Sequence, residues 1–125
     1  MQFKALGNSG MVVPEICLGT MTFGEQNNQQ EAFSQLDYAL ERGVYFWDTA
    51  EMYPVPPKAE TQGATEQIIG NYLKQRGGRD KVFIASKIAG PGYGGSAIRN
   101  GQTRYHRADI QAALEGNLQR LQTDY

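Results

Sequence analysis

The sequence predicts an α/β fold in which a short N-terminal β-hairpin precedes three strand–helix units. Three short apolar runs lack polar–apolar alternation, which is typical of strands covered on both faces in a parallel sheet. A segment with apolar residues at helical spacing follows each run. Glycines after the first two of these segments, at Gly43 and at residues 77–78, predict helix ends.

The hairpin is predicted from the turn-forming residues Gly-Asn-Ser-Gly at positions 7–10. The segments on either side, residues 2–4 and 11–13, are expected to pair as its two strands. Pro14 lacks a backbone donor, so the second strand is expected to end or break there.

The three strand–helix units follow the hairpin in order along the chain. Their strands are predicted at residues 15–19, 44–49 and 81–87, and their helices begin near residues 29, 65 and 109. The apolar helix faces are expected to contain Phe33, Leu36 and Leu40; Ile68, Ile69, Tyr72 and Leu73; and Ile110, Ala113, Leu114, Leu118 and Leu121. In the strands, Trp47 and Cys17 are both predicted to belong to the core.

Two architectures contain such units, a (β/α)8 TIM barrel and a doubly wound open sheet. A closed barrel takes eight units and roughly 250 residues, whereas this chain of 125 residues has three units. Residues 1–125 are therefore expected to form the N-terminal part of a single TIM-barrel domain that stops before the fourth strand. The alternative is a small three-layer domain that closes by dimerising. The open sheet edges of either form are expected to favour self-association.

Composition excludes several functions. The 12 Lys and Arg residues nearly balance the 13 Asp and Glu residues, which argues against non-specific binding to nucleic acid or to an anionic membrane. One cysteine and one histidine argue against a disulfide framework and against a metal site. There is no apolar stretch of the ~18 residues that a membrane span needs and no signal-peptide pattern, so a cytoplasmic location is expected.

Polar side chains gather where the predicted strands end. Gly19 and Thr20 close the first strand, Asp48 lies at the end of the second, and Lys87 ends the third. The carboxyl ends of parallel strands form the rim where α/β enzymes place their chemistry, so an Asp–Lys ion pair is expected there. Tyr53 follows Asp48 by five residues, on the loop that leaves this rim. An ammonium near a phenol favours the phenolate, and such a phenol is suited to act as a general acid.

Several ordered motifs resemble the aldo-keto reductase family. They are residues 48–53 (Asp-Thr-Ala-Glu-Met-Tyr), residues 85–87 (Ala-Ser-Lys) and residues 18–24 (Leu-Gly-Thr-Met-Thr-Phe-Gly). The loop at residues 53–57 and the segment at 60–66 are most similar to the bacterial Tas-type subgroup. The resemblance extends over essentially the whole chain.

The resemblance implies a (β/α)8 barrel that reduces aldehydes and ketones with NADP(H). In this family a hydride passes from the nicotinamide to the carbonyl carbon of a small-molecule substrate, and a tyrosine gives a proton to the carbonyl oxygen. Tyr53 matches that tyrosine, and Asp48 and Lys87 match the Asp and Lys beside it.

The resemblance also implies a cofactor site. The loop formed by Gly19, Thr20 and Met21 matches the one beside the nicotinamide, and Asp48 belongs to the same site. The catalytic histidine of the family follows the next strand, and His106 does not match it, since it is expected in a surface loop. The chain alone is therefore expected to be an incomplete enzyme.

Two further interpretations of the function remain open, a non-catalytic NADPH-binding subunit and an inactive half-barrel fragment.

The glycines at residues 90–95 fit the pattern G-x-G-x-x-G. However, a dinucleotide-binding loop must open directly into a helix, and residues 96–101 are predicted to continue as loop. The stretch is therefore expected to lie over the rim and to shape the substrate pocket.

Overall fold

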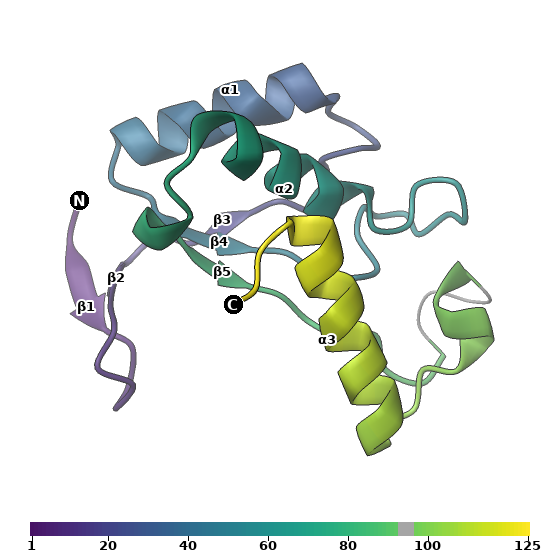
Figure 1. Cartoon of the computed structure of the whole chain (residues 1–125). Coiled ribbons are helices and arrows are strands. Elements are labelled where there is room, and N and C mark those ends of the chain that lie inside the picture. The colour runs from purple at the N-terminus through teal and green to yellow at the C-terminus, as the bar shows by residue number, and fades with distance from the viewer. Residues whose placement is uncertain (93–96) are drawn as a thin grey trace.

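The computed structural model describes residues 1–92 and 97–125 (Figure 1). These residues form a two-stranded antiparallel sheet, a three-stranded parallel sheet and three α-helices. The strands are β1 (Phe3–Ala5), β2 (Val12–Pro14), β3 (Leu18–Gly19), β4 (Phe46–Asp48) and β5 (Phe83–Ala85). The helices are α1 (Gln29–Glu41), α2 (Ala64–Arg76) and α3 (Arg107–Leu121), with short 3-10 turns η1 (Arg79–Lys81) and η3 (Arg99–Gly101).

The predicted hairpin is confirmed. Strands β1 and β2 are antiparallel, and Phe3 lies opposite Pro14, which forms the last residue of β2. The hairpin is attached to the start of β4 through Tyr45, whose hydroxyl donates to the Val12 carbonyl at 3.0 Å and whose ring stacks on Phe3. Figure 1 shows the hairpin at one end of the molecule, away from α3.

The parallel sheet has the strand order β3-β4-β5. Gly19 lies opposite Asp48, and Asp48 lies opposite Ala85, so the three carboxyl ends form one rim. The strands are shorter than predicted. Both β3 and β5 are edge strands with a single neighbour, which limits their ladders, and η1 occupies the predicted start of the third strand.

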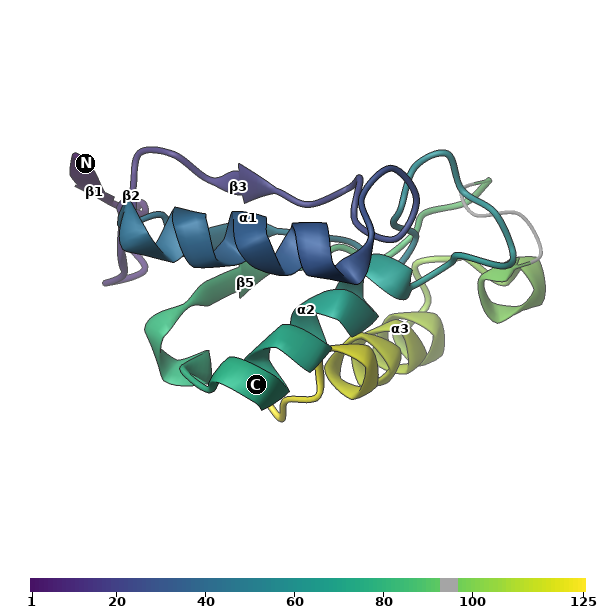
Figure 2. The ribbon, with the colours of Figure 1, turned by 90° about the horizontal axis from the view of Figure 1, so that it is seen from above.

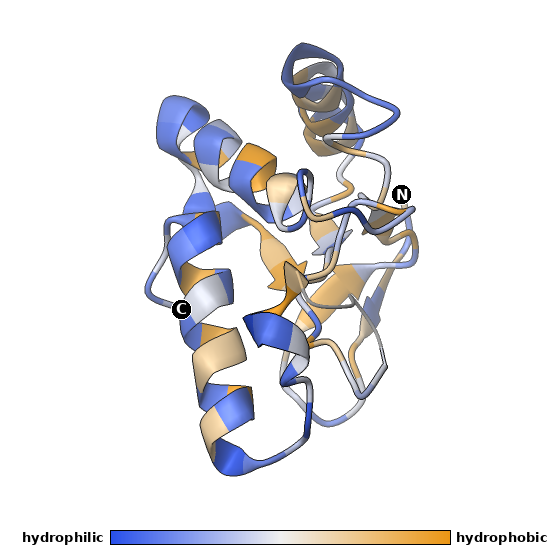
Figure 3. Ribbon diagram, turned by 90° about the vertical axis from the view of Figure 1, so that its right-hand side faces the viewer, coloured by the Kyte–Doolittle hydropathy of each residue, from blue (hydrophilic) through white to orange (hydrophobic). Residues whose placement is uncertain are grey.

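The helices build the core on one face of this sheet (Figures 1 and 2). Trp47 is completely buried there and meets the ring of Tyr72 from α2 edge-to-face at 5.8 Å, as predicted for a side chain facing the helices. Helix α1 begins at a capping box formed by Asn28 and Glu31, and it adds Leu36 to the core. Figure 3 shows apolar strand segments beside these helices.

Two core predictions are wrong. Cys17 is exposed because it precedes the edge strand β3 and faces away from the helices. Ile110 and Leu114 of α3 are also exposed. Helix α3 packs on α2 through the row Ala113, Asn117 and Leu121, which places the neighbouring row outside this contact. Figure 3 shows that polar and apolar residues are mixed along α3.

Helix α3 approaches α2 closely. A Cβ atom on Gly70 would lie 2.3 Å from the backbone oxygen of Arg120, so only glycine fits at this crossing. None of the helices in the described part of the chain is long and apolar enough to cross a membrane.

Candidate active site

The rim of the parallel sheet brings together Asp48, Lys87 and Tyr53. Lys87 Nζ lies 2.7 Å from each carboxylate oxygen of Asp48 and 2.8 Å from the Thr49 carbonyl oxygen. The same ammonium lies 4.9 Å from the centroid of the Tyr53 ring. Two adjacent strand ends and the loop after β4 thus bring a carboxylate, an ammonium and a phenol together.

Lys87 is held firmly although the site is open to water. Its three donors are satisfied by the three oxygens of Asp48 and Thr49. The side chains of Lys87 and Asp48 remain 47% and 38% exposed. An ion pair so exposed contributes little to stability. Its contact with Tyr53 is made through the ring face, as in a cation–π interaction.

The backbone around Tyr53 is fixed on both sides. Its N–H donates to the Ala50 carbonyl at 3.1 Å, and its own carbonyl accepts from Gly63 at 2.9 Å, just before α2. Two residues later, the Val55 N–H donates to the Met21 carbonyl at 3.0 Å. The loops that follow β3 and β4 are therefore joined to each other at the rim.

The predicted cofactor residues occupy two different environments. Thr20 is buried, and both its N–H and its hydroxyl donate to the Asp48 carbonyl, at 3.2 and 2.7 Å. Thr20 therefore supports the backbone of Asp48. Gly19 and Met21 are exposed beside it, and a Cβ atom on Gly19 would meet nothing within 4 Å. Gly19 and Met21 therefore leave open surface beside Asp48.

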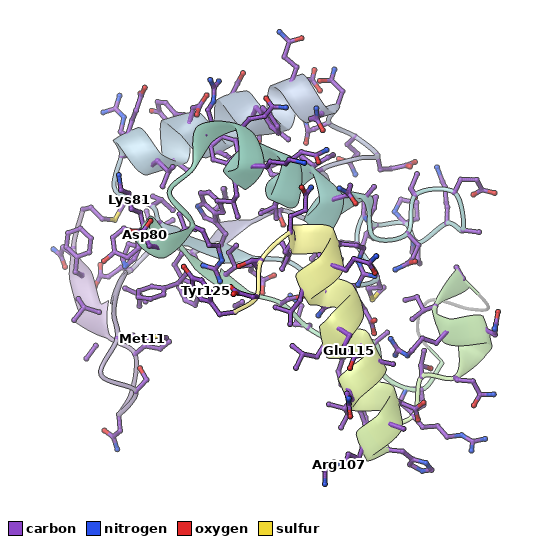
Figure 4. All side chains as sticks on the ribbon, in the orientation of Figure 1. Met11, Asp80, Lys81, Arg107, Glu115 and Tyr125 are labelled. Carbon is purple, nitrogen blue, oxygen red and sulfur yellow. The ribbon has the colours of Figure 1, made fainter. Side chains whose placement is uncertain are left out.

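A small cavity lies beside Tyr53 and Lys87. Its volume is about 230 Å³, and Tyr53, Lys87, Met52, Gly90 and Tyr105 contribute to its walls. A larger cavity of about 450 Å³ lies between α1 and α2 at the opposite end of the sheet, beside Tyr45 and Lys81. Figure 4 shows Lys81 at that end, far from Arg107 at the start of α3. Tyr53 and Lys87 line the smaller of these two cavities and do not line the larger one.

Cys17 lies on the same face of the sheet as this cluster. Partial burial raises the pKa of the Cys17 thiol, and the carboxylate of Asp48 raises this pKa further, while Lys87 acts in the opposite direction. The pKa of the Cys17 thiol therefore depends on both charges of the Asp48–Lys87 pair.

Two buried carboxylates in this region were missed from the sequence. Glu51 lies within the motif at residues 48–53, pairs with Arg99 and accepts a hydrogen bond from the Ala89 N–H. Glu66 of α2 accepts from Ser86 and from Arg120 Nε, the latter at 2.8 Å. The sequence offered one signal for the second network, the polar Asn117 within an apolar helix face, which donates to Ser86 at 3.1 Å.

The glycine-rich stretch after β5 is only partly described, since residues 93–96 lie outside the described residues. His106 is exposed, as predicted, and stands at the N-terminus of α3, remote in sequence from the rim residues.

Comparison with known proteins decides the family. The model of the aldo/keto reductase family matches residues 15–125. This chain belongs to that family. It is 47% identical to the Escherichia coli protein tas over 125 residues, which are all of this chain and 36% of that protein. It is 41% identical over 130 residues to the Bacillus subtilis uncharacterized oxidoreductase YrpG, covering 38% of it.

Solved structures agree with this family assignment. A thermostable aldo-keto reductase crystallised with the inhibitor epalrestat matches the whole chain with a TM-score of 0.75 at 32% identity, over 40% of its own length. A structure from Pseudomonas aeruginosa matches 98% of the chain with a TM-score of 0.76 at 28% identity, over 43% of its length. The predicted fold class, part of a TIM barrel, is thereby confirmed. This chain spans between 36% and 43% of the length of these relatives.

Proposed function

We propose that a protein carrying this chain reduces aldehydes or ketones to alcohols with NADPH. The observation that supports this proposal is the contact of Lys87 with both Asp48 and Tyr53 at the rim of the sheet. Family membership supports the broader role of an oxidoreductase. The specific substrate is a small carbonyl compound that enters the cavity beside Tyr53.

Tyr53 carries the proton that the reduction consumes. The cofactor, when bound, supplies the hydride that adds to the carbonyl carbon. The Tyr53 hydroxyl gives its proton to the carbonyl oxygen, which leaves a phenolate on Tyr53. The Lys87 ammonium, 4.9 Å from the ring, stabilises this negative charge, and Asp48 and Thr49 keep the ammonium in place.

Gly19 and Met21 are the residues of this chain that we place beside the nicotinamide, because they are exposed at the rim next to Asp48. The rest of the cofactor site is expected to be formed by segments that the longer relatives contain and this chain does not. We also propose a cytoplasmic enzyme.

The test is the substitution Tyr53→Phe in a protein that spans the full length of these relatives and contains this chain. Loss of the proton donor is expected to lower carbonyl-dependent oxidation of NADPH by about 10²–10⁴-fold, with cofactor affinity unchanged. Tyr38→Phe, on the exposed side of α1, is the matched control and is expected to keep full activity. Substantial turnover in Tyr53→Phe would contradict the proposal. Binding of NADPH without any turnover in the parent would favour the non-catalytic subunit.

A further inference from the structure

Glu51 is a buried carboxylate that the proposed reaction does not use. Its residue is only 2% exposed, and it lies between Asp48 and Tyr53 in the sequence. Its N–H donates to the Lys87 carbonyl at 3.0 Å, and its carboxylate accepts the N–H of Ala89. Glu51 is therefore hydrogen-bonded to both ends of the segment 87–89, at Lys87 and at Ala89.

The other carboxylate oxygen of Glu51 pairs with Nη1 of Arg99, 48 residues further along the chain. A buried carboxylate needs such a partner, because an unpaired charge in the interior is strongly disfavoured. Arg99 also donates through Nε to the Gln102 carbonyl at 3.2 Å. The guanidinium therefore connects the motif at residues 48–53 to the loop that contains η3.

This loop has an unfavourable backbone conformation. Arg99 and Asn100 both have positive φ angles, 47° and 54°. Two successive residues other than glycine in this region persist only where surrounding contacts hold them. The Glu51–Arg99 pair is the charged contact that holds them here.

The loop then forms one wall of the small cavity. Thr103 of this loop is buried, and Tyr105 lines the cavity that Tyr53 and Lys87 also line. A Cβ atom on Gly90 would lie 2.2 Å from the Tyr105 hydroxyl, so the absence of a side chain at Gly90 makes room for this wall. The position of Tyr105 therefore depends on how the loop is fixed.

We propose that Glu51 and Arg99 are positioning residues that fix the wall formed by residues 99–105 over the substrate pocket. This inference rests on the proposed reductase function. It assigns the pair to carbonyl-substrate binding rather than to proton transfer, since neither side chain lines the cavity beside Tyr53.

The first test measures kinetics of Arg99→Gln, Arg99→Lys and Glu51→Gln in the full-length protein that contains this chain. Loss of one charge-assisted contact corresponds to a roughly tenfold rise in KM for the carbonyl substrate, with KM for NADPH and kcat nearly unchanged. Arg99→Lys is expected to restore part of the effect because it keeps the charge. Arg104→Gln, an exposed arginine on the same loop, is the matched control.

The second test measures hydrogen exchange in the same full-length protein, and it does not depend on turnover. The amide of Thr103, bonded to the Gly101 carbonyl at 2.9 Å, is expected to exchange faster in Arg99→Gln than in Arg104→Gln. Unchanged exchange would overturn the inference, and so would faster exchange with an unchanged substrate KM. If the parent protein shows no turnover, the proposed function fails, and exchange alone decides whether the pair fixes the loop.

Discussion

On one face of the parallel sheet Trp47 packs beneath Tyr72, and one residue further along the same strand Asp48 meets Lys87 on the opposite face. Trp47 is inaccessible to water, whereas Asp48 and Lys87 remain accessible. A single strand end therefore serves stability on its helix face and chemistry on its open face, because side chains alternate along a strand.

The ion pairs on the two faces differ in the same way. Glu66 and Arg120 have side chains that are 0% and 23% exposed, and Ser86 and Asn117 complete their hydrogen bonds. This network lies behind β5, on the side of α2 and α3. Ser86 directly precedes Lys87, so the buried network anchors the same strand exit that presents the lysine at the rim. The buried Glu66–Arg120 pair therefore stabilises the fold, whereas the exposed Asp48–Lys87 pair is accessible to a ligand.

The largest effect on turnover is expected from a substitution of Lys87 on the open face of the sheet. Lys87→Met in a full-length protein containing this chain removes the charge that stabilises the Tyr53 phenolate, so turnover is expected to fall at least about 100-fold. The free energy of unfolding is expected to change by less than about 1 kcal/mol, because the pair is exposed. NADPH absorbance and urea unfolding measure the two quantities. A large loss of stability with normal turnover would reverse the assignment of the two faces.

A smaller effect is expected from the matched pair Glu66→Gln and Asp48→Asn, compared in the 125-residue chain. Glu66→Gln leaves the partly buried Arg120 guanidinium without its counter-charge, which is expected to cost about 3 kcal/mol of unfolding free energy. Asp48→Asn changes an exposed pair and is expected to cost less than about 1 kcal/mol. Urea unfolding followed by circular dichroism compares them. Equal losses would show that exposure does not distinguish the two pairs.

Much of this architecture follows from local sequence patterns. Helix faces such as Ile68, Ile69, Tyr72 and Leu73 repeat at helical spacing, and all four are buried in α2. The approach of Asp48 to Lys87 follows from parallel topology, since both residues come at the carboxyl ends of neighbouring strands. Patterns of this kind depend only on spacing and on strand order.

Contacts between distant segments were not predictable in the same way. Glu51 and Arg99 are 48 residues apart, and neither belongs to a periodic pattern that would bring them together. Two residues of the predicted apolar face of α3, Ile110 and Leu114, were misjudged. They are exposed because α3 packs on α2 through the row with Ala113 and Leu121, and Gly70 allows the close approach. Burial of Cys17 was misjudged because composition says nothing about which strand lies at a sheet edge.

The smallest effect sharpens the comparison, because the Cys17 thiol reports on the charges of the open face. The thiolate is the reactive form, and burial together with Asp48 raises the thiol pKa. Alkylation of the 125-residue chain by iodoacetamide is therefore expected to reach its half-maximal rate at a higher pH than for a cysteine in a short peptide. Asp48→Asn is expected to lower that midpoint, and Lys87→Met is expected to raise it, because the two charges act in opposite directions. Midpoints that move in the same direction in both variants would place the thiol outside the field of the pair and would remove Cys17 from the open face.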